Sequence, residues 1–292
     1  MLVETTLGKV NCVIAGEGNP VILIHGFGCS HIQWMFTTEA LAQAGYMSIS
    51  IDLPGFGLSD VPLQPITTDR YADIVQEVVD KLNLSEVVLV GNSMGGFVAW
   101  LCASRMGVAV RGLVLTNTAG APQNPVLPPR NKHRRKHPLS FSKVPGLAAI
   151  AGLRMSNPLT RIIVRPLIHK SFGDSARLTP EVFEALHSAA KQARIVFKNM
   201  LRFSSLQDSD RVLEQIECPT LIMWGDKDNI VPMANMDYFV DHISHAKLKV
   251  YFGVGHLPML EIPDEFNTDL LSFLATVDGL TNPYNHRPVN NL

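Results

Sequence analysis

Short apolar runs recur along the chain, and each one ends in glycine, proline or a polar residue. The runs are rich in Val, Ile and Leu and have about the length of a strand. Such runs are typical of strands that are covered on both faces of a sheet. Six segments fit this description and are predicted to be strands: VILIHG at 21–26, GYMSISIDL at 45–53, EVVLVGNS at 86–93, VRGLVLT at 110–116, PTLIMWG at 219–225 and KLKVYF at 247–252.

Segments with helical spacing lie between these runs. In 67–84 the apolar residues recur every three or four positions, and Thr68 is the expected N-cap. The segments 94–106 and 263–277 are predicted to be helices as well. Strands that alternate with helices favour an α/β fold, in which a mostly parallel central sheet carries helices on both faces.

The alternation breaks between residues 121 and 205, where strand signals are missing from the sequence. The segment 179–201 places its apolar residues on one face of a helix, and Thr179, Pro180 and Glu181 form a suitable helix start. We interpret this stretch as a helical insertion over the carboxyl edge of the sheet. The predicted organisation is a core of residues 1–120 and 206–280, a helical cap at 121–205 and a polar tail at 281–292.

Composition and charge narrow the class of protein. Of the 292 residues, 46% are hydrophobic and 17% are charged, and the formal net charge is −1. These values favour a globular protein and argue against a nucleic-acid binder. The basic run 128–138 is interpreted as a solvated part of the cap, and a contact with an anionic surface or substrate is left open.

The cysteines, the apolar runs and the first residues bear on the cellular location of the protein. The four cysteines show no CxxC spacing, so no disulfide framework is expected. No apolar run reaches the ~20 residues of a membrane span, and the first residues lack the pattern of a signal peptide. We therefore expect a soluble cytoplasmic enzyme, with an organellar location left open.

The segment GNSMG, from Gly91 to Gly95, fits the pattern G-x-S-x-G between a predicted strand and a predicted helix. A nucleophile elbow requires this context, because its serine sits in a sharp, strained turn with an exposed hydroxyl. Side chains at 91 and 95 would collide across such a turn, which explains both glycines. Ser93 is therefore the predicted nucleophile.

A serine hydroxyl needs a base, and the base needs an acid that orients it. Among ten histidines, His256 is the predicted base because it follows the last predicted strand in a loop with glycines. Asp228 is the preferred acid because it lies further into the loop after the preceding strand. Asp226 is interpreted as a turn residue, and Asp208 and Asp210 as residues at helix caps or in solvent.

The oxyanion of a tetrahedral intermediate requires two N–H donors. Met94, directly after the nucleophile, is predicted to supply one of them. Phe27 in the HGFG turn is predicted to supply the other, with Gly26 and Gly28 giving the backbone room. His25 is expected to hydrogen-bond within its own turn. The predicted substrate pocket comprises Gly26, Gly28, Trp34 and Leu257.

Five segments together resemble the α/β-hydrolase superfamily: VILIHGFG, IDLPGFGLSD, LVGNSMGG, PTLIMWGDKDNIVP and GVGHLPMLEIPDEF, spread over residues 21–266. The resemblance implies the α/β-hydrolase fold, with Ser93, Asp228 and His256 as a catalytic triad in the chain order of that family. It also implies the oxyanion hole and the cap assigned above, and no cofactor. The sequence contains neither an HExxH motif nor a Cys/His pair at ligand spacing, so no metal site is expected.

Three functions remain, and we rank hydrolysis of a carboxylic ester of a small or medium apolar substrate first. A serine at the elbow argues against the haloalkane dehalogenases and epoxide hydrolases, which carry Asp there. The expected partner is a small-molecule ester, and a homo-oligomer is left open. A receptor-like ligand binder with little turnover is the third alternative.

The second alternative is a carbon–carbon hydrolase that acts on a vinylogous diketone of the meta-cleavage-product type. GNSMGG and the cap segment LTPEVFEAL resemble those enzymes. They tend to carry an arginine just beyond that segment, where this chain has Leu186 and His187. They also tend to carry Trp after the catalytic histidine, where this chain has Leu257. Arg194 is a candidate substitute for the missing arginine.

Overall fold

The computed structural model describes residues 1–106, 109–121, 159–193, 201–202 and 209–279. Its main sheet has eight strands in the order β1-β2-β4-β3-β6-β7-β9-β10. The pairs β1–β2 and β2–β4 are antiparallel, and the other pairs are parallel. The strands are β1 (Leu2–Thr5), β2 (Gly8–Ala15), β3 (Asn19–Ile24), β4 (Tyr46–Ile51), β6 (Val87–Asn92), β7 (Val110–Thr116), β9 (Thr220–Gly225) and β10 (Lys247–Tyr251).

The alternation of side chains along a strand explains why these sequences are apolar almost throughout. In β3, Val21 and Leu23 join the apolar cluster on one side of the sheet, whereas Ile22 and Ile24 join the cluster on the other. All four are fully buried, because both faces are covered. The six strands predicted from the sequence are confirmed, and the hairpin of β1 and β2 adds two that the apolar pattern does not indicate.

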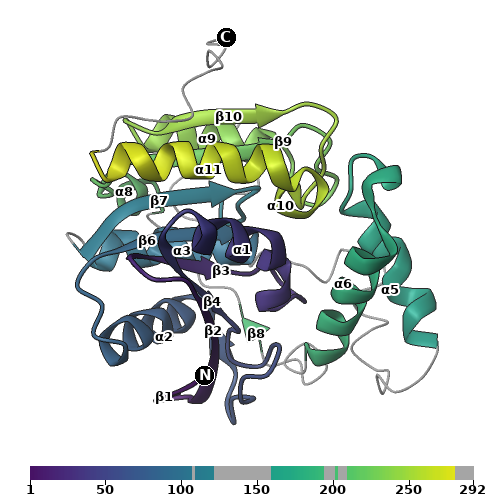
Figure 1. Ribbon diagram of the computed structural model, residues 1–292, viewed down its shortest axis with the longest axis horizontal. Helices are drawn as coiled ribbons and strands as arrows, with labels where there is room; N and C mark the ends of the chain where they lie inside the picture. Colours follow the sequence, from purple (N-terminus) through teal and green to yellow (C-terminus); the bar gives the residue numbers. More distant parts are fainter. Residues whose placement is uncertain (107–108, 122–158, 194–200, 203–208, 280–292) are drawn as a thin grey trace, which may run out of the picture.

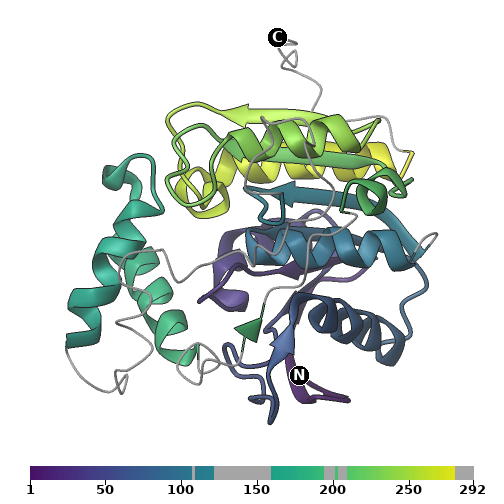
Figure 2. The same ribbon diagram turned by 180° about the vertical axis from the view of Figure 1, so that it is seen from behind.

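Helices cover the sheet in two layers. One face carries α1 (Met35–Gln43) and α11 (Pro263–Val277) (Figure 1). The other face carries α2 (Thr68–Lys81), α3 (Met94–Met106), α8 (Ser209–Glu214) and α9 (Ala234–His242), which are in front in Figure 2. The predicted α/β class, with a mostly parallel sheet between helices, is confirmed.

Capping hydrogen bonds test two predicted helix starts. α2 begins at Thr68, and its N-cap is Thr67, whose hydroxyl accepts from an N–H of the first turn. The prediction of Thr68 as the cap is wrong by one residue, because two adjacent threonines offer the same hydroxyl and the backbone is extended at Thr67. α6 (Pro180–Gln192) begins as predicted, with Thr179 as N-cap and Pro180 in the first turn.

The described part of the cap lies beyond the carboxyl ends of the parallel strands (Figure 1). It contains α5 (Leu159–Lys170), the 3-10 helix η4 (Ser175–Arg177) and α6, and α5 packs against α6. α6 ends at Gln192, earlier than the predicted helix over 179–201, because the backbone leaves the helical conformation at the next residue. A second, two-stranded sheet pairs β5 (Ile66–Thr67) with β8 (Leu201–Arg202) in parallel.

The limits of the cap, residues 121 and 205, stay a prediction.

Within the described ranges, no helix combines the length and the apolar character needed to cross a bilayer. Several predicted features lie outside the described residues: the basic run 128–138, Arg194, Asp208 and the tail 281–292.

Candidate active site

Ser93 occupies a sharp turn between β6 and α3. Its backbone is left-handed, with φ at 55°, and the residue is buried. A Cβ atom on Gly91 would lie 2.3 Å from the carbonyl oxygen of Gly95, and a Cβ on Gly95 would lie 2.1 Å from that of Ile24. The turn therefore requires glycine at both positions. A left-handed serine stores about 1–3 kcal/mol of strain, a property that is common at functional turns.

His256 and Asp228 are joined by a direct hydrogen bond. They lie in the loops that follow β10 and β9, and the distance from His256 Nδ1 to Asp228 Oδ2 is 2.7 Å. The aspartate side chain is fully buried. Because a carboxylate only accepts hydrogen bonds, Nδ1 carries the proton and Nε2 is left as an acceptor. A general base for a serine hydroxyl needs this tautomer.

Three further donors hold the carboxylate of Asp228. The side-chain amide of Asn117 donates to Oδ2 at 2.7 Å, and the N–H groups of Ile230 and Val231 donate to Oδ1 at 2.7 and 2.9 Å. Asn117 follows β7 with φ at 44°, a conformation that asparagine tolerates better than most residues. The imidazole of His256 is therefore oriented by a carboxylate that is itself fixed.

The competing aspartates have other contacts. Asp226 accepts from the N–H of Gly253 at 2.6 Å, so it connects the loops after β9 and β10 as a turn residue. Asp210 accepts from the hydroxyl of Tyr238. Among the described aspartates considered as the acid, Asp228 is the one that contacts the histidine.

Two buried side-chain amides connect the elbow, the HGFG turn and the His256 loop. Gln33 Oε1 accepts from the N–H of Gly26 at 2.9 Å, and Gln33 Nε2 donates to Asn92 Oδ1 at 2.8 Å. Asn92 Nδ2 in turn donates to the carbonyls of His256 and Thr116, both at 3.1 Å. Both amides are fully buried. Three loops that are distant in sequence are thereby held in one arrangement.

Replacing Gln33 with methionine is expected to lower the free energy of unfolding by about 1–3 kcal/mol for each group left unpaired. Methionine keeps the length of the side chain, but the Gly26 N–H and the Asn92 carbonyl oxygen lose their partner. Urea unfolding followed by tryptophan fluorescence measures the change. Gln43→Met is the control, since that exposed side chain donates to Glu39 in the same helix and should shift stability by less than ~0.5 kcal/mol. Equal stability of the two variants would contradict the role given to Gln33.

His25 is structural, as predicted. The residue is fully buried, and its Nε2 accepts from the N–H of Leu53 at 3.0 Å. Its Nδ1 donates to the carbonyl of Gly26 at 2.8 Å, within its own turn. Burial lowers the pKa of His25, which keeps the imidazole neutral and consistent with one accepting and one donating nitrogen.

The HGFG turn lies directly against the elbow. A Cβ atom on Gly26 would lie 3.3 Å from the Cβ of Ser93. The N–H of Gly26 already donates to Gln33, so it is not the donor expected for an oxyanion. Phe27 therefore stays the predicted oxyanion donor from this turn, and Met94, the first residue of α3, stays the other.

Asp52, directly after β4, fixes the segment that carries Gln33. Its carboxylate accepts from the N–H of His31 at 2.6 Å, from the ring Nδ1 of His31 at 2.9 Å and from Asn11 Nδ2 at 2.9 Å. Burial alone would raise the pKa of Asp52, but the hydrogen bonds, led by that from His31, outweigh it and lower the pKa to about 2. His31 begins the 3-10 helix η1 (His31–Trp34).

Across the described ranges, no group of three or more His, Cys, Asp or Glu is placed to hold a metal ion.

The predicted pocket residues Trp34 and Leu257 belong to an apolar cluster that reaches into the cap. This cluster includes Val182 and Leu186 of α6, and α6 packs against η1. Trp34 is fully buried, with its ring centroid 6.4 Å from that of Phe266. The cap helix therefore faces the turn that follows HGFG with apolar side chains. That these residues contact a substrate stays a prediction.

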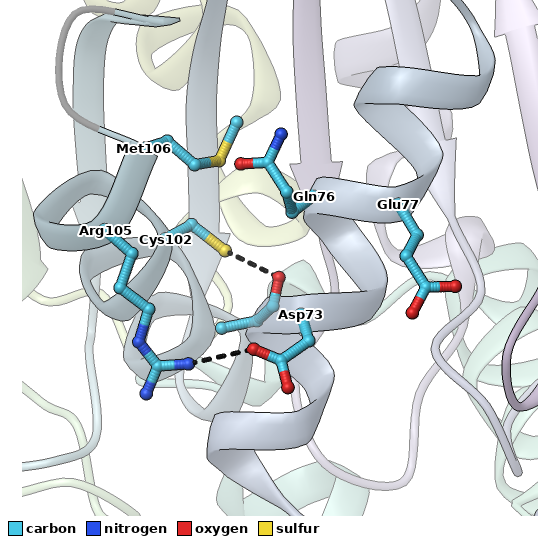
Figure 3. Close-up of a pocket in the computed structure, with 7 residues that line it drawn as sticks. Asp73, Gln76, Glu77, Cys102, Arg105 and Met106 are labelled. Atoms are coloured by element: carbon cyan, nitrogen blue, oxygen red, sulfur yellow. Dashed lines mark hydrogen bonds and ion pairs between the residues drawn. The ribbon is translucent and has the colours of Figure 1, made fainter.

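A hollow of ≈ 370 Å³ lies elsewhere, between α2 and α3 (Figure 3). Beside it, Arg105 donates to Asp73 and the Cys102 thiol donates to the carbonyl of Ala72. Cys102 is in the second half of α3, about 12 Å along the helix from the elbow. Burial raises the pKa of Cys102 to about 12, so this thiol is not a nucleophile at neutral pH. The hollow is separate from the candidate active site.

Sequence reasoning misses two of the residues that shape the site. Asn117 follows a predicted strand directly, and ligand sites gather at the carboxyl ends of parallel strands, so its position is a usable signal. Gln33 lies in a short 3-10 helix and has no local feature that distinguishes it from a surface residue.

A match to one protein family over most of its sequence places the chain in that family. The family described as alpha/beta hydrolase fold matches residues 19–263. The dihydrolipoyllysine-residue acetyltransferase component of the acetoin cleaving system of Pseudomonas putida is 27% identical over 281 residues. That match covers 89% of this chain and 65% of the relative, so the chain spans slightly less than two thirds of it.

Two solved structures share the fold over almost the whole chain. A thermophilic esterase from Thermogutta terrifontis is 25% identical with a TM-score of 0.71, covering 95% of this chain and 98% of that one. A meta-cleavage product hydrolase from Pseudomonas fluorescens IP01 (CumD) is 26% identical with a TM-score of 0.72, covering 92% and 94%. With the family match over residues 19–263, this chain belongs to the alpha/beta hydrolase fold family and is a hydrolase of that family.

Proposed function

We propose that the protein is a serine esterase that cleaves a carboxylic ester of a small or medium apolar substrate through an acyl-enzyme. The observation that carries the proposal is the 2.7 Å hydrogen bond between His256 Nδ1 and the buried Asp228. Asn92 ties the histidine loop to the elbow that holds Ser93. A hydroxyl, a correctly protonated imidazole and a fixed carboxylate are the groups that acyl transfer requires.

In the proposed reaction, His256 Nε2 takes the proton of the Ser93 hydroxyl while Oγ attacks the ester carbonyl. The N–H groups of Phe27 and Met94 bind the oxyanion of the tetrahedral intermediate. The imidazolium then gives its proton to the leaving alcohol, and the acyl group stays on Ser93. The same imidazole deprotonates a water molecule, which attacks the acyl carbonyl. The imidazolium then returns this proton to Ser93 Oγ as the bond to the acyl group breaks and the acid is released.

The charges of the described cap support an uncharged substrate. Arg161 pairs with Glu184 at 2.6 Å, and Arg177 lies 3.5 Å from Glu261, so two of the three arginines in the described cap are engaged by carboxylates of the protein. The third, Arg165, is exposed on α5, with its Nε 3.5 Å from His169 Nε2. Burial lowers the pKa of His187, which makes it a neutral side chain rather than an additional cation. The apolar side chains of α6 suit an alkyl or aryl group better than a carboxylate.

Carbon–carbon hydrolysis of a vinylogous diketo acid is the second candidate. It is supported by the likeness to the meta-cleavage product hydrolase, which at 26% identity is as strong as the likeness to the esterase. Both reactions would use the same triad, and they differ in the group that the cap must bind.

A substrate panel tests the proposal. We expect a higher kcat/KM on at least one p-nitrophenyl ester, in a series from acetate to octanoate, than on a vinylogous diketo acid. Spectrophotometric initial rates on the same enzyme preparation measure both. Faster consumption of the diketo acid would replace the proposal with carbon–carbon hydrolysis. Tight binding of either compound with negligible turnover would replace it with a receptor-like role.

A further inference from the structure

Glu261 is a buried carboxylate at the end of α10 (Pro258–Glu261), shortly after the histidine loop. Its Oε2 accepts from the N–H of Gly255 at 2.8 Å and from that of Gly173 at 3.0 Å. Its Oε1 accepts from the N–H of Asp174 at 3.0 Å and from Arg177 Nη1 at 3.5 Å. A buried charge requires partners of this kind. The reaction proposed above makes no use of this carboxylate.

The four donors come from two parts of the fold. Gly255 directly precedes His256, so this bond holds the backbone of the histidine loop. Gly173, Asp174 and Arg177 belong to the cap, between the end of α5 and the end of η4. A single carboxylate therefore joins the loop of the proposed base to the cap.

The same two segments also touch through backbone atoms. The N–H of His256 donates to the carbonyl of Ser171 at 2.7 Å. A Cβ atom on Gly255 would lie 2.4 Å from that carbonyl oxygen, and a Cβ on Gly173 would lie 2.7 Å from the carbonyl oxygen of Gly253. No side chain fits between the segments, so the position of one fixes the position of the other.

We propose that Glu261 is a positioning residue that couples the seating of the cap to the orientation of His256. The inference rests on the function proposed above, because that function makes His256 the base. The imidazole is held in line with Ser93 while the cap segment and the histidine loop share the carboxylate. When the cap segment moves away, the His256 N–H loses its acceptor on Ser171 and Glu261 loses its donors from the cap, so the base loses its alignment.

The test is Glu261→Gln, which keeps the shape of the side chain but replaces one acceptor oxygen with a donor. Either the pair of N–H groups on Oε2 or the donors on Oε1 then face an NH₂ group. We expect kcat per active site to fall about 10- to 100-fold with KM nearly unchanged, because small displacements of a catalytic group have effects of this size. Titration of active sites with a fluorophosphonate measures the fraction of competent enzyme.

The titration separates positioning from folding. A purely structural role would lower the fraction of competent enzyme and leave kcat per site at the wild-type value, and this result would overturn the inference. Glu265→Gln is the matched control, since Glu265 is an exposed partner of Lys249 in the first turn of α11. It should match the wild type in both quantities.

A second variant approaches the contact from the cap. Gly173→Ala places a methyl group against the backbone of the histidine loop, so it should lower kcat per site in the same way. It also keeps the inference testable if Glu261→Gln does not fold. A folded Gly173→Ala enzyme with wild-type kcat per site would overturn the inference.

Amide hydrogen exchange gives a result that does not depend on the substrate. In Glu261→Gln, the amides of Gly173 and Asp174 in the cap and those of Gly255 and His256 in the loop should all exchange faster. Faster exchange in the cap pair alone would show that the two segments are not coupled, and would overturn the inference. Failure of the ester assay in the wild type would overturn the proposed function and leave this exchange result to be judged separately.

Discussion

Replacement of Ser93 by alanine is expected to reduce kcat on the preferred ester by about a millionfold, to the rate left by the oxyanion hole and substrate binding alone. The reason is chemical, since no acyl-enzyme forms without the hydroxyl. Alanine adopts the left-handed backbone of the elbow at a cost similar to that of serine, so the fold should be kept. Initial rates with p-nitrophenyl esters, together with circular dichroism, measure both effects.

Ser104→Ala is the matched control for this variant. Ser104 lies in α3, the helix that begins directly after the elbow. Its hydroxyl donates to the carbonyl of Leu101 at 2.9 Å. Its removal should leave kcat at the wild-type value. Substantial ester turnover by a correctly folded Ser93→Ala protein would remove Ser93 from the mechanism, and the proposed function with it.

Asp228→Asn is expected to lower kcat by about 10⁴-fold with little change in KM, because the histidine would adopt the wrong tautomer. In the wild type His256 Nδ1 and Asn117 Nδ2 both donate to Oδ2, and an amide nitrogen in that place would accept from neither. If the amide oxygen keeps the N–H groups of Ile230 and Val231, the amide NH₂ faces the imidazole. The proton then moves to Nε2, which can no longer accept the proton of Ser93.

Asp226→Asn gives the comparison for this prediction. Asp226 lies in the same loop, and its carboxylate accepts from the N–H of Gly253 without contact to the imidazole. An asparagine oxygen can still accept that bond, so activity should change little. A larger loss in Asp226→Asn than in Asp228→Asn would mean that the acid has been assigned to the wrong aspartate.

Local pattern is enough to predict the central strands, because residues such as Val88 and Val90 are buried on a sheet covered on both sides. The hairpin at the edge of the sheet escapes the same reasoning. β1 has only four residues, and in β2 the polar Lys9 and Asn11 interrupt the apolar residues, so neither strand forms a continuous apolar run. The N-cap of α2 moves from Thr68 to Thr67 because capping depends on backbone dihedral angles that the sequence does not reveal.

The proposed catalytic residues can be predicted because each sits at a strand end with glycines nearby, and these signals are local. Gln33 and Glu261 cannot be predicted in this way. Gln33 contacts Asn92, which is 59 positions away in sequence, and Glu261 contacts Gly173, which is 88 positions away. Their roles depend on which loops the fold brings together, and only coordinates contain that information.

The close backbone contacts around Gly91, Gly95 and Gly26, together with the Gln33–Asn92 chain, have a consequence for how substrate preference can change. The backbone around the proposed catalytic residues is packed so closely that one added methyl group disturbs several loops at once. Substitutions that keep activity are therefore expected mainly in the cap helices α5 and α6. A new ester preference should therefore be sought by substituting the apolar side chains of α6 while the residues around the elbow are kept.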